Sequence, residues 1–409
     1  MIAWMTGKDG TLPDRTLVTG MELGTYVFTL LMFAGAFGTI REAGLYLPPV
    51  LWLIRCGLRR TIDLNWREPL FVCLIALSVS GLLSSFLAHG VWQALFLFKR
   101  EYLKMILLYC VISTVFTPVR RLESLCRFLA FAGLPYLLYA AYTLTVNLVQ
   151  TGTTVYLETR YFATIIIFFL PFFLLQGTTA PMGRWMVWKI PVVVSFIELI
   201  VIGVRGSWLA AATILAIWRL SWKNPRHRWS GRRAIIAVVV VLLGVIVVFL
   251  LFPSQFQLIR EHTFAVIQMS LRLEGWEVFV AMALDQPLFG HGLDDTSMSA
   301  RFKEVYREMK GTEVPPLVPT TPHSQFLKIF YQQGLSGLLL YLSLILLFVW
   351  RLISTAARRT GASLGIVAAL IAGCLGEYAL HCLIEDRSLI PLGVLLGMAG
   401  AFIGPGRKR

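Results

Sequence analysis

Long apolar runs are the feature that most constrains this chain. Several stretches reach the roughly 20 apolar residues that a helix needs to cross a bilayer. Of the 409 residues, 57% are hydrophobic and only 14% are charged, whereas soluble domains average about 25% charged residues. The mean hydropathy is +0.72. These values exclude a disordered chain and a soluble multidomain enzyme, and they predict an all-α, polytopic membrane protein.

The apolar runs divide into about twelve expected membrane-spanning helices. Pro48 and Pro49 interrupt the second span, and basic residues crowd the start of the fourth. The expected spans are 22–40, 43–58, 69–88, 102–118, 128–148, 161–177, 186–203, 207–221, 233–252, 329–350, 362–383 and 388–404. The chain then divides into residues 1–252 with nine spans, a loop at 253–328, and residues 329–409 with three spans.

The charge pattern predicts an orientation for these spans. The net charge is +15, from 37 lysines and arginines against 22 acidic residues. More than half of the basic residues fall in alternate loops, which the positive-inside rule assigns to the cytosol. Both chain ends belong to this set, in agreement with an even number of spans. The membrane therefore explains the positive charge, and no nucleic-acid partner is expected.

The N-terminal segment and the cysteines give two further expectations. The first 21 residues are polar and the first apolar run is long enough to remain as a span, so no cleavable signal peptide is expected. All six cysteines fall in expected spans or on the cytosolic side. No disulfide framework is therefore expected in the exported loops.

The loop at 253–328 differs from the others because it is long and lies on the non-cytosolic side. Loops of this length are usually functional. Its pattern predicts helices at 256–270, 272–286 and 297–310, followed by a proline-rich run. We expect a small helical cap on the outer face of the membrane.

Several arginines lie at the outer ends of spans, against the topological bias. Arg160, Arg205 and Arg272 are the clearest cases, and Arg41 and Arg100 are further candidates. A half-buried guanidinium is costly unless an anion pairs with it, and arginine suits bidentate contacts to phosphate. Each arginine alone could instead snorkel to lipid head groups or pair with an acid. Together they predict a site for a lipid-linked phosphate or diphosphate in the outer leaflet.

His323 is the best single candidate for chemistry. Thr321 is the expected N-cap and Pro322 the expected first residue of a helix that continues into span ten. The positive end of a helix dipole disfavours imidazolium, so His323 should be neutral and able to act as a general base. The alternative is an interfacial histidine that bonds to the backbone.

Other chemistries find little support in the sequence. No set of acids and histidines has zinc-type spacing, and no Walker loop or dinucleotide fingerprint is present. No metal and no cofactor are expected. Glu198 and Glu377 lie inside spans, but two isolated acids are a weak indication of a proton-driven transporter.

Four short motifs, in order, resemble the O-antigen ligase/polymerase superfamily. Residues 323–327 (His-Ser-Gln-Phe-Leu) and 333–337 (Gln-Gly-Leu-Ser-Gly) resemble its "His-Asn … Leu … Glu-Gly … Gly" signature. Residues 272–292 resemble its "Arg … Trp … Pro … Gly-Xaa-Gly" segment, and residues 204–206 resemble its "Ser-Arg-Gly" motif. The resemblance covers about residues 200–340 well. Ser324 and Gln333 depart from the usual Asn and Glu.

The resemblance implies an inverting, metal- and nucleotide-independent membrane glycosyltransferase of the GT-C type. Such enzymes take a glycan from undecaprenyl diphosphate at the periplasmic face of the Gram-negative inner membrane. A ligase transfers O-antigen to a sugar hydroxyl of lipid A-core and so completes lipopolysaccharide. In this interpretation His323 is the general base, with Arg205 and Arg272 as further catalytic residues. Arg160, Arg205, Arg272, Arg41 and Arg100 are then the expected diphosphate-binding residues.

Three rivals remain open at this stage. An O-antigen polymerase shares the donor but extends a second lipid-linked glycan. A protein-directed oligosaccharyltransferase usually carries a longer periplasmic C-terminal part, whereas this sequence stops five residues after the last expected span. A lipid-linked glycan transporter or flippase would be expected to show inverted repeats, and no repeat is evident.

Overall fold

The computed structural model describes residues 12–88, 90–151, 156–179, 185–222, 264–316, 318–356, 363–383, 385 and 388–404. All regular secondary structure in these ranges is helical, as the sequence predicted. The expected ninth span at 233–252 lies outside them. The first nine α-helices are α1 (Leu12–Leu31), α2 (Gly38–Arg59), α3 (Pro69–Leu87), α4 (Val91–Phe98), α5 (Lys104–Val115), α6 (Val119–Thr151), α7 (Tyr156–Thr179), α8 (Trp185–Ile202) and α9 (Arg205–Trp222).

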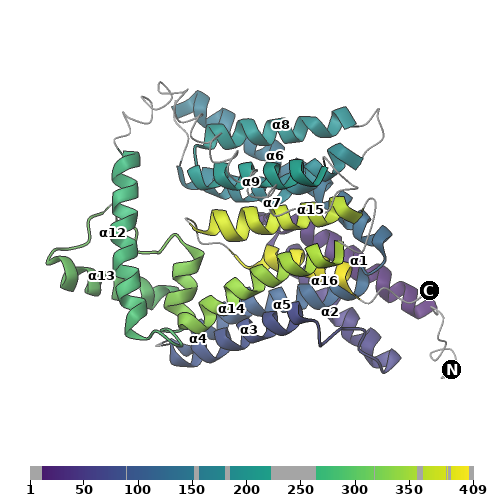
Figure 1. Cartoon of the computed structure of the whole chain (residues 1–409), viewed down its shortest axis with the longest axis horizontal. Helices are drawn as coiled ribbons and strands as arrows, with labels where there is room; N and C mark the ends of the chain where they lie inside the picture. The colour runs from purple at the N-terminus through teal and green to yellow at the C-terminus, as the bar shows by residue number, and fades with distance from the viewer. Residues whose placement is uncertain are drawn as a thin grey trace.

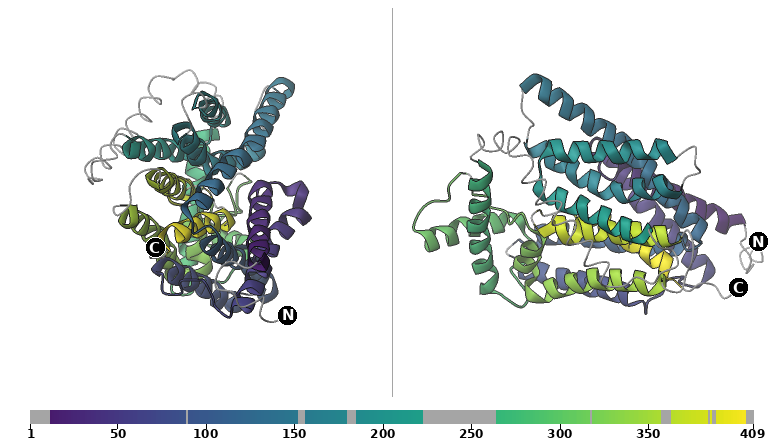
Figure 2. Two further views of the ribbon diagram at one scale, coloured as in Figure 1. Left: turned by 90° about the vertical axis from the view of Figure 1, so that its right-hand side faces the viewer. Right: turned by 45° about the horizontal axis from the view of Figure 1, so that its top comes forward.

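The later helices are α12 (Phe264–Asp285), α13 (Asp295–Lys310), α14 (Gln325–Ala356), α15 (Ser363–Gly373) and α16 (Ile390–Ile403). Short 3-10 turns occupy Gly35–Phe37 and His381–Leu383, and π-helical turns occupy Lys99–Leu103 and Cys374–Leu380. Most helices lie side by side in one bundle, whereas α12 crosses one end of that bundle with α13 beside it (Figure 1, Figure 2).

Five described helices are long and apolar enough to cross a membrane. They are Pro69–Leu87, Val119–Asn147, Arg160–Thr179, Gln325–Ala356 and Leu364–Leu383, and Ile390–Ile403 is a shorter apolar helix. Their outer faces carry large apolar side chains, such as Leu83, Leu138 and Leu346, which are more than half exposed in the isolated chain. This exposure suits a lipid environment. The chain is therefore a helical membrane protein.

The first two helices, α1 and α2, form a close pair, and their bounds differ from the first expected span. A single helix over 22–40 is wrong, because α1 ends at Leu31 and α2 begins at Gly38, with a glycine-containing turn between them. Pro48 and Pro49 lie buried inside α2 instead of ending it. A Cβ on Gly24 of α1 would collide with the Pro48 ring, so small residues let the two helices approach closely.

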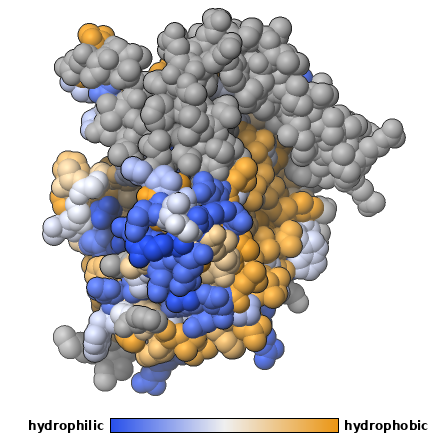
Figure 3. Space-filling model, turned by 90° about the vertical axis from the view of Figure 1, so that its left-hand side faces the viewer, coloured by the Kyte–Doolittle hydropathy of each residue, from blue (hydrophilic) through white to orange (hydrophobic). Residues whose placement is uncertain are grey.

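The two helices of the expected cap pack on one another. The break expected between 270 and 272 is wrong, because α12 continues through these residues to Asp285. The helix expected at 297–310 is present as α13, and the part of the loop at 256–263 lies outside the described residues. Phe279 of α12 packs on Phe302 of α13, inside a small apolar core separate from that of the bundle. Figure 3 shows that the end of the molecule formed by these helices is largely hydrophilic.

A buried tyrosine adds a polar connection between α12 and α13. The Tyr306 hydroxyl donates to Glu274 Oε1 at 2.5 Å. Burial and the neighbouring carboxylate raise the pKa of Tyr306 to about 12, so the hydroxyl stays protonated as a donor. The cap is thus held by both apolar packing and charge-assisted hydrogen bonds.

The turn after α12 lies backbone against backbone on the interrupted part of α14, and this contact fixes the cap to the bundle. The turn after α12 donates from His291 N to Tyr331 O (2.9 Å) and from Gly292 N to Gln332 O (3.0 Å), and it accepts at Pro287 O from Leu335 N (2.6 Å). Gly334 interrupts the helical geometry of α14 there, with φ 67° and ψ −165°. A Cβ on Gly334 would fall onto the Leu288 backbone, and one on Gly290 would fall onto Gln332. Both motif glycines therefore serve this close approach.

Tight ion pairs lie at the opposite end of the long helices from the cap. Arg351, near the end of α14, makes a bidentate contact to Glu68 at 2.7 and 2.8 Å. Arg59, at the end of α2, bonds to Asp14 at 2.6 Å. Bidentate geometry of this kind gives the strongest charge-assisted contacts. These pairs stabilise helix ends that the charge pattern assigned to the cytosol.

We expect Gly334→Ala to destabilise the protein by about 2 kcal/mol or more, because the residue occupies a glycine-only backbone region and its Cβ has no room. Thermal unfolding in detergent measures the effect. Gly57→Ala is the matched control, since Gly57 lies in helix α2 with open space around its Cβ position. That variant should be as stable as wild type or more so by about 0.5–1 kcal/mol. Equal melting temperatures for both variants would contradict the role given to Gly334.

Candidate functional site

His323 lies in a strained connection immediately before α14. The helix start expected at Thr321 and Pro322 is wrong, because α14 begins at Gln325 and the Ser324 hydroxyl accepts from Leu327 N at 3.5 Å. Serine at this position is a better N-cap than the expected threonine, because it lies directly before the helix. His323 itself adopts φ 43°, and within the described ranges only Arg60 is another non-glycine residue with positive φ. Strain of this kind is concentrated at functional sites.

Glu385 brings together three of the residues that the sequence singled out. Its side chain is 3% exposed. Arg160 Nε lies 3.6 Å from Glu385 Oε1, and Arg272 Nη2 lies 3.4 Å from the same oxygen. His323 Nδ1 lies 3.9 Å from Glu385 Oε2. We call these four residues the Glu385 cluster.

The members of the Glu385 cluster come from four separate parts of the chain. Arg160 is in the first turns of α7, Arg272 is in α12, His323 precedes α14, and Glu385 follows the turn at His381–Leu383. Since α12 crosses the end of the bundle, the cluster lies at the end that carries the cap (Figure 1). Two guanidinium groups face one carboxylate, so the cluster carries net positive charge with His323 neutral. It can therefore attract an anion and accept a proton.

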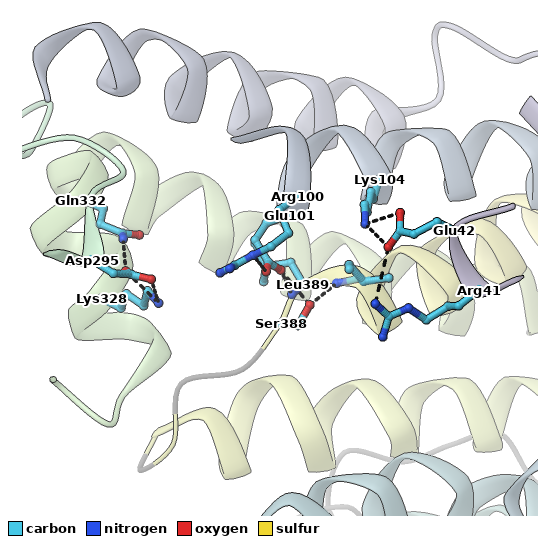
Figure 4. A network of polar contacts seen from close by, with 11 residues as sticks. Arg41, Glu42, Arg100, Glu101, Lys104, Asp295, Lys328, Gln332, Ser388 and Leu389 are labelled. Carbon is cyan, nitrogen blue, oxygen red and sulfur yellow. Dashed lines mark hydrogen bonds and ion pairs between the residues drawn. The ribbon is translucent and has the colours of Figure 1, made fainter. Parts of the chain in front are cut away.

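Hydrogen bonds on both sides fix the segment that carries His323. Trp276 Nε1, on α12, donates to Pro322 O at 2.7 Å. Thr321 Oγ1 lies 3.3 Å from His323 Nε2. On the other side, Asp295 of α13 accepts from Lys328 and Gln332 of α14 (Figure 4), at 3.1 and 3.0 Å respectively. The cap thus determines where the imidazole lies.

A cavity of about 670 Å³ is lined in part by residues that lie close in sequence to two members of the cluster. Its walls include Tyr161, which follows Arg160 in α7, and Ser388, which lies close in sequence to Glu385. Both π-helical turns of the described residues contribute to the walls, and such turns occur frequently at functional sites. The remaining walls are mostly aromatic and aliphatic side chains from α1 and the turn after it, and from α2, α4, α7 and α16. The cavity therefore combines apolar surface with charged groups.

Arg41 and Arg100 line this cavity and are not among the residues that contact Glu385. Arg41 lies 3.5 Å from Glu42, whose carboxylate also accepts two contacts from Lys104 at 2.7 Å. Arg100 Nε lies 3.2 Å from Glu101 (Figure 4). The expected set of arginines is thus divided between the Glu385 cluster and the cavity.

Two further residues, His291 in the segment 272–292 and Glu377 in an expected span, have partners outside the Glu385 cluster. Arg205 is the first residue of α9, and its side chain lies outside the described part of the structure. Buried His291 contacts Met282 O through Nε2 at 2.7 Å and stacks on Tyr331, which indicates a packing role. Glu377 lines the cavity and lies 2.9 Å from His381 Nδ1, so this acid within a span has a partner.

Sequence reasoning missed the acids of the site. Glu385 was not singled out from the sequence, because it belongs to no set of acids and histidines with metal-type spacing. An acid at the outer end of a span, where basic residues also gather, was the available signal. Among the described residues, no group of three or more His, Cys, Asp or Glu side chains could hold a metal ion. The contacts of Glu385 with Arg160 and Arg272 have the distances of ion pairs.

The fold and the site define a helical membrane protein with a basic, histidine-containing centre beneath a small helical cap. The family model described as O-antigen ligase matches residues 190–342. No curated protein matches the sequence. Residues 190–342 are therefore similar to the O-antigen ligase family, as the motifs had indicated. The matched segment contains Arg205, Arg272 and His323, whereas Arg160 and Glu385 lie outside it.

Proposed function

We propose that this protein is an O-antigen ligase, which transfers O-antigen glycan from undecaprenyl diphosphate to a sugar hydroxyl of lipid A-core. One observation carries the proposal. Arg160, Arg272 and His323, each chosen from sequence for diphosphate or base chemistry, lie around the single buried carboxylate of Glu385. The O-antigen ligase match over 190–342 supports the same class of reaction.

His323 is proposed as the general base. Glu385 lies on the Nδ1 side of the ring, so it favours the tautomer with the proton on Nδ1. Nε2, which lies 3.3 Å from the Thr321 hydroxyl, is then the nitrogen that accepts a proton. Nε2 then takes the proton of the acceptor hydroxyl while the oxygen attacks the anomeric carbon from the face opposite the diphosphate. This attack inverts the configuration. A well-placed base contributes about 10²–10⁴-fold to the rate.

Arg160, Arg272 and Arg205 are proposed to bind the diphosphate and to stabilise the negative charge that develops as it leaves. Arg160 and Arg272 both lie within 4 Å of the same carboxylate oxygen of Glu385, and a guanidinium group carries five N–H donors in a planar fork that suits phosphate oxygens. Preorganised cations in a site with little water stabilise such charge most effectively. The donor supplies its own leaving group, so neither a metal nor a nucleotide is required.

The cavity is proposed to hold the lipid end of the donor. Its apolar walls suit isoprene units, while Arg41 and Arg100 can approach the phosphate nearest the lipid. The Glu385 cluster next to the cavity would then face the phosphate nearest the sugar. In this arrangement the five expected arginines bind one extended diphosphate from two sides.

The proposed orientation follows from the same arrangement. The cap and the Glu385 cluster would face the periplasm, and both termini would lie in the cytosol, with about twelve GT-C-like spans in the bacterial inner membrane. The ion pairs of Arg351 and Arg59 then lie at the cytosolic ends of their helices. Lipid A-core and the lipid-linked glycan both reach the periplasmic leaflet, where the cluster would meet them.

Transfer by the purified protein in nanodiscs tests the proposed acceptor. Lipid A-core and undecaprenyl-diphosphate-linked glycan are offered separately, with labelled donor in each case. We expect one discrete labelled product on lipid A-core, because a ligase adds a completed glycan once. A ladder of products on the polyprenyl carrier would instead identify a polymerase.

We expect His323→Asn to abolish transfer, with a loss of at least about 10²-fold in single-turnover rate. Asparagine tolerates the positive φ found at this position, so the backbone should persist. Donor affinity and the melting temperature should stay close to wild type, because the base acts on the acceptor. Turnover like that of wild type would exclude His323 as the base.

We expect Arg160→Lys and Arg272→Lys to weaken donor binding by about ten- to a hundredfold, because lysine keeps the charge but loses the bidentate fork. The measurement is donor affinity in nanodiscs, with folding checked by thermal unfolding. Arg301→Lys is the matched control, since Arg301 forms an ion pair with Asp285 at the surface of α13. Full affinity in both cluster variants would show that these arginines do not bind the diphosphate.

A further inference from the structure

The ion pairs of Glu385 differ from the other ion pairs of buried acids in the described ranges. Buried Glu68 receives two contacts from one arginine at 2.7 and 2.8 Å. Glu385 is equally buried, yet its arginines lie 3.4 and 3.6 Å away and share one oxygen. Charge-assisted hydrogen bonds between nitrogen and oxygen are normally about 2.7–2.9 Å long. Glu385 therefore balances the charge of its arginines without making ideal contacts to them.

The position of Glu385 also resembles that of a substrate phosphate. One carboxylate oxygen faces both guanidinium groups, and the other faces the imidazole. A phosphate oxygen bound by Arg160 and Arg272 would need the same neighbours. Without an anion between them, the two guanidinium groups would repel one another in a poorly solvated place.

We propose that Glu385 is an internal substitute for the substrate phosphate. It holds Arg160, Arg272 and His323 in place when no diphosphate is bound, and it competes with the diphosphate for the two arginines. This competition weakens the hold on undecaprenyl diphosphate after transfer and so speeds its release. The inference rests on the proposed function, because it assigns the arginines to a diphosphate, and it makes Glu385 a positioning residue.

Competition makes an unusual prediction about affinity. Glu385→Gln removes one negative charge from beside the arginines and keeps the size of the side chain. At the effective dielectric constant near 20 that suits protein sites, a unit charge several ångströms from a phosphate changes its affinity on the order of ten- to a hundredfold. Removal of Glu385 should therefore tighten diphosphate binding, whereas the loss of a purely structural ion pair would weaken it or leave it unchanged.

The test measures the equilibrium affinity of the full-length protein in nanodiscs for undecaprenyl diphosphate. We expect Glu385→Gln to bind at least about tenfold more tightly than wild type, with a lower kcat and a lower KM for the donor. Glu385→Asp keeps the charge but moves it back by one methylene group. It should bind as tightly as wild type or more tightly, by less than the glutamine variant.

Glu313→Gln controls for net charge. Glu313 is exposed and pairs with Arg307 near the end of α13, so its removal makes the same charge change without touching the cluster. Its affinity should equal that of wild type. If Glu313→Gln and Glu385→Gln gain the same affinity for undecaprenyl diphosphate, the gain comes from the overall charge of the protein and the proposal is overturned.

The proposal is overturned if Glu385→Gln binds undecaprenyl diphosphate as tightly as wild type or more weakly. If the glutamine variant does not fold, weaker binding by Glu385→Asp overturns it instead. Arg160→Ala and Arg272→Ala separate this failure from failure of the proposed function. If both alanine variants keep wild-type affinity, the arginines do not bind diphosphate and both proposals fail. If they lose affinity while Glu385→Gln does not gain it, only the role of Glu385 is excluded.

Discussion

One buried carboxylate allows two guanidinium groups to lie together at the end of an apolar bundle. Arg160 and Arg272 come from helices far apart in the sequence, and each would cost several kcal/mol to desolvate without an anion. Glu385 lies between them and also faces His323. Glu385, in the segment after α15, therefore connects α7 with the cap and with the residue before α14. A lipid-facing protein can keep such groups only where they are paired or meet a ligand.

The position of the imidazole depends on contacts made some distance from it. Gly290 and Gly334 let the turn after α12 lie directly on the broken helix α14. This contact holds α12 against the connection that carries His323, and Trp276 bonds to the backbone just before it. A non-glycine residue with positive φ persists only when its surroundings determine its conformation. The motif glycines are thus connected to the chemistry through the backbone, although neither belongs to the Glu385 cluster.

The sequence predicted the helical membrane fold, and it singled out three residues that lie together in the structure. Charges placed against the positive-inside bias are visible in a single chain. Two of them, Arg160 and Arg272, meet in the structure beside His323, which was singled out for its place at an expected helix start. Their common partner could not be found in this way, because pairing with Glu385 depends on tertiary structure. The start of α14 was misplaced because Thr321 was predicted as the N-cap, whereas Ser324 accepts the hydrogen bond from Leu327 N. The break in α12 was wrong since packing against α13 and α14 outweighs weak local periodicity.

The cavity and the Glu385 cluster differ in how their charges are balanced, and this difference assigns them separate tasks. In the cavity, Glu42 and Glu101 lie beside basic residues, and apolar side chains form most of the wall. Such a surface can hold an apolar chain by excluding water, and it keeps Arg41 and Arg100 at its wall. In the cluster, two guanidinium groups face one acid, so an added anion is favoured. Apolar burial can therefore hold a lipid-linked substrate while the excess charge beside it acts on the diphosphate. Because electrostatic contacts strengthen as water is excluded, the apolar cavity also strengthens the action of the neighbouring arginines.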